Sequence, residues 1–140
     1  LSAMKVRLLP DLLPDDVAAR LELITRFPGP PMGPFDRSHD LFGDGAVRLV
    51  ELPGHAPGQV GAFVAATDQR TYLLAADGCW VRRDLERGGG RVHPHLATDR
   101  PAQDQTYETL RQALAMPDVV VVPSHCPDAA RELLADGYDG

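Results

Sequence analysis

The sequence predicts a mixed α/β domain in which helices flank a sheet. The first observation is a length of 140 residues with 44% apolar and 24% charged residues, which suits one soluble domain with its own core. The second is a group of short β-rich runs in the middle of the chain. The third is a change to helical periodicity after Thr98. We therefore treat residues 1–140 as a single domain with layered α/β (α+β) architecture.

The N-terminal third predicts one strand, one helix and one long loop. Residues 5–9 alternate enough for a short strand. A helix is expected over about residues 15–26, because one face carries Val17, Leu21 and Ile24. Glycine and proline then crowd into residues 27–45, which predicts a long loop, and loops of this length are usually functional or disordered.

Three strands are predicted in the middle of the chain. The first is the run AVRLVELP at 46–53, which a proline ends. The second and third, at 60–67 and 71–76, are separated by a short polar turn and therefore pair naturally as a hairpin.

The C-terminal part predicts two helices with a strand between them. The first helix could begin at Pro101, since proline is tolerated in a first turn. The segment 118–125 is almost wholly apolar, as expected of a strand covered on both faces. A last helix follows, with Pro127 in its first turn and Gly137 at its end.

Charge and composition exclude several classes of protein. The 14 basic and 20 acidic residues give a net charge of -6, which argues against nucleic-acid binding and against an anionic membrane surface. No apolar run approaches the ~20 residues that span a bilayer, and the start LSAMKVRLLP has neither the length nor the apolar stretch expected of a signal peptide. Two cysteines are too few for a disulfide framework. We therefore expect a cytoplasmic protein.

Three side chains that can bind metal follow predicted strands. They are His55, Asp77 and His125, and imidazole and carboxylate are common ligands of zinc, iron and manganese. Each also has an ordinary explanation taken alone: a surface histidine, an Asp-Gly turn and a helix-capping residue. Their shared position at strand ends favours one site at one edge of the sheet.

These segments resemble the metallo-β-lactamase superfamily. The passage VRLVELPGHAPGQVGAFVAATDQRTYLLAADGCW is similar to its strand–PGHxPG–strand–hairpin–Asp passage, and VVVVPSHCPD to its final strand and last ligand histidine. The resemblance implies half of an αββα sandwich and a hydrolase that attacks an ester or lactone with metal-bound hydroxide. It also implies that His55, Asp77 and His125 are metal ligands, with Asp77 the catalytic carboxylate that bridges two metals.

The superfamily's HxHxDH motif is not in this sequence. The three ligands alone would supply about two per metal, which is too few for tight binding. The sole H-x-H, at residues 93–95, lies after Asp77 and is interpreted as a polar loop. We therefore expect the C-terminal portion of a larger hydrolase, whose HxHxDH-bearing N-terminal half is absent, and which is inactive in isolation.

The finer resemblance is to lactonases that act on N-acyl homoserine lactones. It rests on the leading RLLPDLLPDD and on the long insertion after Asp77. Zinc is the expected metal, with iron or manganese as alternatives. An apolar acyl pocket could be lined by Met32, Phe35 and Phe42 of the long loop, although ordinary loop packing would also explain them.

Two other functions remain open. The chain could be a non-catalytic half-domain that oligomerises or binds a partner, or it could bind one metal across a dimer interface. Half of a sandwich would leave one apolar sheet face uncovered. We therefore expect a homodimer or a higher oligomer.

Overall fold

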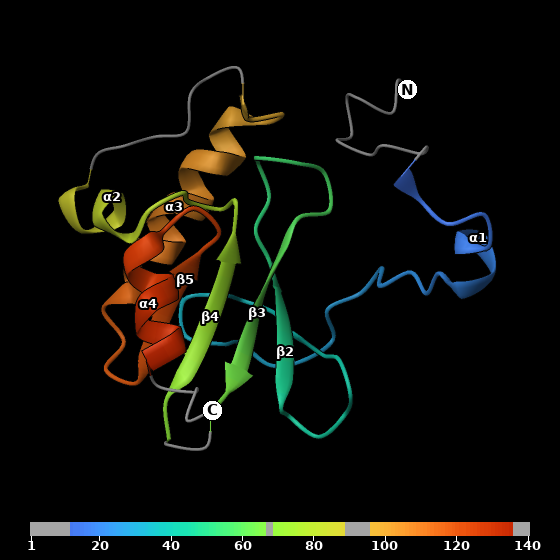
Figure 1. Ribbon diagram of the computed structural model, residues 1–140, viewed down its shortest axis with the longest axis horizontal. Helices are drawn as coiled ribbons and strands as arrows, with labels where there is room; N and C mark the ends of the chain where they lie inside the picture. Colours follow the sequence, from blue (N-terminus) through green and yellow to red (C-terminus); the bar gives the residue numbers. More distant parts are fainter. Residues whose placement is uncertain (1–11, 67–68, 89–95, 136–140) are drawn as a thin grey trace.

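A five-stranded sheet forms the centre of the computed structural model (Figure 1), which describes residues 12–66, 69–88 and 96–135. The strands lie in the sheet in chain order: β1 (His39–Asp40), β2 (Val47–Glu51), β3 (Val60–Ala65), β4 (Thr71–Ala76) and β5 (Val119–Pro123). Neighbours among the first four pair antiparallel, whereas β5 is parallel to β4. The predicted mixed sheet is confirmed.

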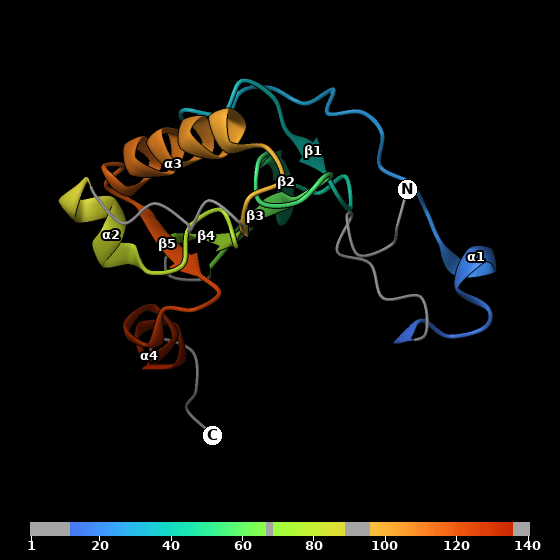
Figure 2. The ribbon, with the colours of Figure 1, turned by 90° about the horizontal axis from the view of Figure 1, so that it is seen from above.

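Three helices lie against this sheet: α2 (Arg82–Arg87), α3 (Arg100–Leu114) and α4 (Pro127–Ala135). The short helix α1 (Val17–Arg20) lies apart from the sheet and buries none of its residues (Figure 1). Figure 2 shows α3 above one face and α4 below the other. None of the helices within the described ranges is long and apolar enough to cross a membrane.

Several predicted elements are found at their expected positions. The β3–β4 hairpin pairs Ala65 with Thr71 across its short turn. Helix α3 starts after Asp99, whose side chain accepts a hydrogen bond from the Ala102 amide and so caps the helix. The predicted strand at 5–9, the H-x-H at 93–95 and the helix end at Gly137 lie outside the described residues.

The helix predicted over 15–26 is wrong in extent. Helix α1 is four residues long, and the chain is extended from Leu21 onward. Leu21 and Ile24 are exposed, so the apolar stripe has no surface to pack against. Because short helices owe most of their stability to such packing, periodicity alone does not sustain this one.

Two elements lie in segments predicted as loops. The two-residue strand β1 exists because it pairs with Arg48 and Leu49 of β2, which is a contact between distant residues. Helix α2 ends at Gly88, which has a φ of 64°, a left-handed conformation that suits glycine.

The core lies between the sheet and α3. It is built from apolar side chains of β2–β5, of α2 and α3, and of the loop before β1: Phe35, Val50, Leu52, Phe63, Leu73, Ala75, Cys79, Leu85, Leu110, Ala113 and Val121. Burial of these side chains supplies the main stabilising free energy of the fold.

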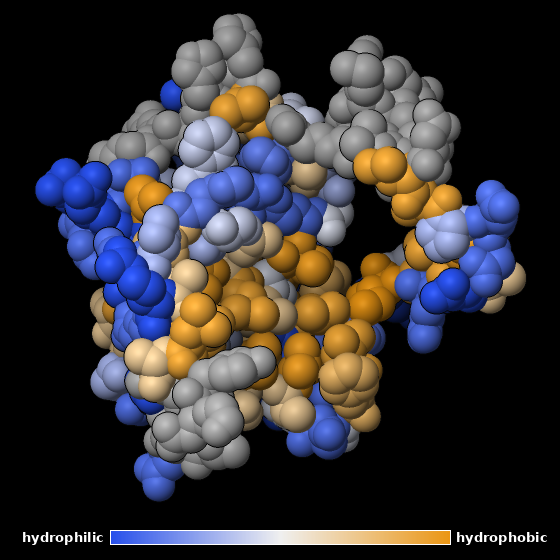
Figure 3. Space-filling view, viewed as in Figure 1, coloured by the Kyte–Doolittle hydropathy of each residue, from blue (hydrophilic) through white to orange (hydrophobic). Residues whose placement is uncertain are grey.

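The opposite face of the sheet, here called the open face, is also apolar. Side chains of paired residues point to the same face, so the strand register defines two rows across β2–β5. These rows are Leu49–Ala62–Leu74–Val122 and Val47–Val64–Tyr72–Val120. Figure 3 shows apolar surface over the middle of this face, and Leu74 is 39% exposed there. Helix α4 covers part of the β5 side, where its leucines border a hollow with Leu74 and Val122.

Candidate metal centre

His55 lies in the loop after β2. Gly54, which precedes it, has a φ of 126°, a conformation that other residues rarely adopt. This turn places the imidazole against the body of the protein, where His55 is 7% exposed. The loop thus presents a nearly buried histidine at the end of the sheet.

Asp77 directly follows β4 in a strained turn. Ala76 has a φ of 45°, which is unusual for a residue other than glycine, and the pairing of β4 with β5 shifts register between Leu74 and Ala76. The Gly78 amide closes the turn by donating to the Ala75 carbonyl at 2.9 Å. Strain of this kind clusters at functional sites.

His125 follows β5 on the neighbouring strand end. The Ser124 amide donates to the Ala76 carbonyl at 3.2 Å, which ties this segment to the turn that carries Asp77. The imidazole ring packs against Trp80, with ring centroids 5.5 Å apart. The side chain of His125 is 60% exposed, so this side of the site faces solvent.

The structure brings the three predicted residues together, with His55 and His125 on either side of Asp77. Nε2 of His55 lies 3.6 Å from Oδ2 of Asp77, and Nε2 of His125 lies 3.1 Å from Oδ1. The two imidazoles therefore face different oxygens of one carboxylate. Oδ1 is buried and makes no hydrogen bond of good geometry within the described part of the chain.

The comparisons with known proteins find lactonases. No family model matches the chain. It is similar to the N-acyl homoserine lactonase AttM of Rhizobium radiobacter, 28% identical over 97 residues, which are 69% of this chain and 36% of the relative. The protein of the same name from Azorhizobium caulinodans is 28% identical over 94 residues, 67% of this chain and 35% of the relative.

Solved structures show the same likeness. One is an N-acyl homoserine lactone hydrolase with the product N-hexanoyl-L-homoserine bound at its catalytic metal center. Another is AiiA of B. thuringiensis with N-decanoyl-L-homoserine bound at its active site. Each has a TM-score of 0.54 and 17% identity, over 68% of this chain and 36% of that chain. The predicted similarity to N-acyl homoserine lactonases is confirmed, and the solved structures show that part of the fold is shared.

The lactonases that this chain matches are longer proteins. The chain spans about a third of the length of the curated relatives it matches. Activities and ligands that those names describe therefore belong to longer proteins.

The donor set fits a divalent metal but does not complete a site. Imidazole nitrogen and carboxylate oxygen suit such ions, and a buried carboxylate oxygen without a hydrogen bond is free to coordinate. Yet no group of three or more His, Cys, Asp or Glu side chains among the described residues is arranged to hold one ion. The geometry explains this, because each Asp77 oxygen faces only one of the two histidines.

The three residues predicted to line an acyl pocket do not meet at this centre. Phe35 is buried in the core, where its ring packs edge-on against Phe63. Met32 packs partly buried against the core, and Phe42 is 69% exposed in the loop between β1 and β2. That loop enters β2 at its start, whereas His55 follows the end of β2.

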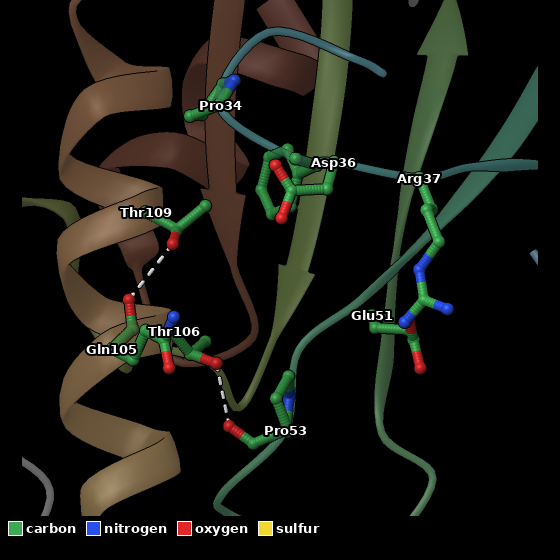
Figure 4. A pocket seen from close by; sticks show the side chains of 9 residues that line it. Pro34, Asp36, Arg37, Glu51, Pro53, Gln105, Thr106 and Thr109 are labelled. Carbon is green, nitrogen blue, oxygen red and sulfur yellow. Dashed lines mark hydrogen bonds and ion pairs between the residues drawn. The ribbon is translucent and has the colours of Figure 1, made fainter. Parts of the chain in front are cut away.

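A polar hollow lies between the loop before β1 and α3 (Figure 4). Its volume is about 230 Å³, and its walls include Asp36, Arg37, Glu51 and Thr109. Arg37 and Glu51 form an exposed ion pair at 2.9 Å on the side of the hollow away from α3. None of the three proposed metal ligands lines this hollow.

Sequence reasoning missed the residues that hold the two ligand loops in place. These are on and just before α3, above all Gln103, and they contact the backbone next to His55 and next to Asp77. The only local signal was the predicted start of this helix. Which loops it touches is a property of the tertiary structure.

Proposed function

We propose that this chain is the C-terminal portion of a metal-dependent hydrolase that opens a lactone or a related ester. The observation that carries the proposal is the placement of two histidines from separate strand ends on the two oxygens of Asp77. The similarity to longer N-acyl homoserine lactonases supports an acyl lactone as substrate.

In this proposal the chain contributes ligands and orientation. Asp77 would hold metal together with His55 through one carboxylate oxygen and with His125 through the other. Zinc is the metal we propose first, with iron or manganese as alternatives of the same donor chemistry. When bound, the metal polarises the substrate carbonyl and lowers the pKa of a water molecule. His55 is the more buried of the two histidines and would hold metal away from solvent, whereas His125 would hold it on the solvent side.

Metal binding tests this site directly. The purified chain is dialysed against Zn²⁺, and bound metal is measured by inductively coupled plasma mass spectrometry. We expect bound metal in the wild type and its loss in His55→Ala. His39→Ala is the matched control, because His39 lies in the edge strand β1 against Phe27. Binding that is absent, or that survives His55→Ala, would overturn the proposal.

Activity is tested separately. With about two ligands for each metal position, we expect hydrolysis of an N-acyl homoserine lactone by the chain alone to be far slower than by a full-length relative. Hydrolysis at a full-length rate would show that the chain is a complete enzyme.

The open face supports a second role, self-association in the cytoplasm. Its two rows contain no charged side chain, so two copies can stack without burying a charge. We expect a dimer by analytical ultracentrifugation at micromolar concentration, and a monomer for Leu74→Glu. Gln105→Glu, a change at an exposed residue of α3 on the other side of the sheet, should leave the dimer intact. A wild-type monomer would refute this role.

A further inference from the structure

We propose that the N-terminal half of α3 positions the metal centre, with Gln103 as the residue that joins the His55 loop to the Asp77 turn. This inference rests on the metal site proposed above. It assigns no metal contact to Gln103, whose role is to hold two ligands at the correct separation.

The His55 loop is attached to the start of α3 by several hydrogen bonds. The amides of Thr98 and Asp99 donate to the Gly54 carbonyl at 2.8 and 2.9 Å, and the Thr98 hydroxyl donates to it at 3.0 Å. Two turns into the helix, the Thr106 hydroxyl donates to the Pro53 carbonyl at 2.7 Å (Figure 4). The two residues before His55 are thus bound to one helix.

Gln103 contacts both loops at once. Its side-chain amide donates to the Gly78 carbonyl at 2.7 Å, one residue after Asp77. On the other side, the Gly54 backbone lies so close that a Cβ there would overlap the Gln103 backbone and lie 2.6 Å from its Cβ. A single residue therefore sets the distance between the two loops.

The chemistry of Gln103 supports a positioning role. The residue is 4% exposed, and an apolar side chain would fill this place without the cost of burying an amide. The amide at this position is explained by the hydrogen bond to the turn that carries Asp77. Groups that orient metal ligands from behind typically change metal affinity by about 10–100-fold when they are removed.

The test is a Co²⁺ titration of the full chain, followed by visible absorption, whose band positions report coordination geometry. Gln103→Met keeps the length of the side chain and removes the donor. Thr106→Val removes the hydroxyl that holds the His55 loop. Thr109→Val is the matched control, because its hydroxyl donates to the Gln105 carbonyl of the same helix at 3.0 Å (Figure 4).

We expect Gln103→Met and Thr106→Val to weaken Co²⁺ binding by about tenfold or more and to shift its absorption bands. Thr109→Val should bind as the wild type does. The stability of the metal-free variants is measured in parallel, since a merely structural role would lower stability and leave affinity and spectrum unchanged. That result would overturn the inference.

Two further outcomes are decisive. If Gln103→Met does not fold, the Thr106→Val variant provides the test. A Co²⁺ affinity equal to that of the wild type in this variant overturns the positioning role of α3. If the wild type binds no Co²⁺, the proposed metal site itself fails and this inference fails with it. If the wild type binds Co²⁺ and both variants bind it with the same affinity, the metal site stands and only the positioning role of Gln103 is refuted.

Discussion

Replacing Gly54 by alanine tests the close contact between the His55 loop and α3. The backbone of Gly54 has a φ of 126°, and an alanine there costs about 1–3 kcal/mol in strain. The new Cβ would also overlap the backbone of Gln103, which cannot move aside as a flexible side chain can. Overpacking of this kind costs about 1–3 kcal/mol. The free energy of unfolding should therefore fall by about 2–6 kcal/mol.

Gly58 provides the matched control, because it lies in the same PGHAPG segment. It also has a positive φ, of 74°, but an added Cβ there meets no atom within 4 Å. Gly58→Ala should therefore cost only the backbone term, about 1–2 kcal/mol. Urea unfolding is followed by the fluorescence of Trp80, the single tryptophan of the chain. If Gly54→Ala costs no more than Gly58→Ala, the close approach to α3 is refuted.

Three further predictions concern the core, a thiol and an ion pair. Leu73→Ala, at a fully buried residue of β4, should lower the free energy of unfolding by about 2–5 kcal/mol in the same urea assay, and a smaller loss would contradict its central place in the core. Burial raises the pKa of the Cys79 thiol to about 12, so it should resist alkylation at pH 8 in the folded protein, and its contribution to stability should be lost as pH rises from about 9. Mass spectrometry of the alkylated peptides would show modified Cys79 if this is wrong. Arg82 and Glu132 join α2 to α4 at 2.6 Å, and Glu132→Gln should cost no more than about 1 kcal/mol by thermal unfolding because the pair is partly exposed.

The sequence predicted the elements whose signal is local. Strands β2 to β5 and helices α3 and α4 were found within a few residues, because alternation, apolar runs and flanking prolines and glycines report directly on nearby backbone. The three candidate ligands were found for a related reason. Each lies shortly after the end of a strand, and β2, β4 and β5 end at the same edge of the sheet, which brings the residues that follow them together.

The predictions that failed concern features that depend on contacts between residues far apart in the chain. The helix over 15–26 has the right periodicity but no surface to cover, and β1 exists only through its pairing with β2. The loop residues Met32, Phe35 and Phe42 are apolar, and their sequence does not indicate whether they meet the core, the solvent or a ligand. In the structure Phe35 joins the core and Phe42 faces solvent.

By itself, the sequence determined which short segments form strands and helices and which side chains carry metal-binding chemistry. Only the tertiary structure decided that two histidines face the two oxygens of Asp77, that Gly54 rather than Gly58 lies against α3, and that Gln103 joins the two loops. The physical reason is the range of the forces involved. Backbone preference and periodicity act over a few neighbouring residues, whereas close packing and buried hydrogen bonds join segments far apart in the chain, and those contacts define the site.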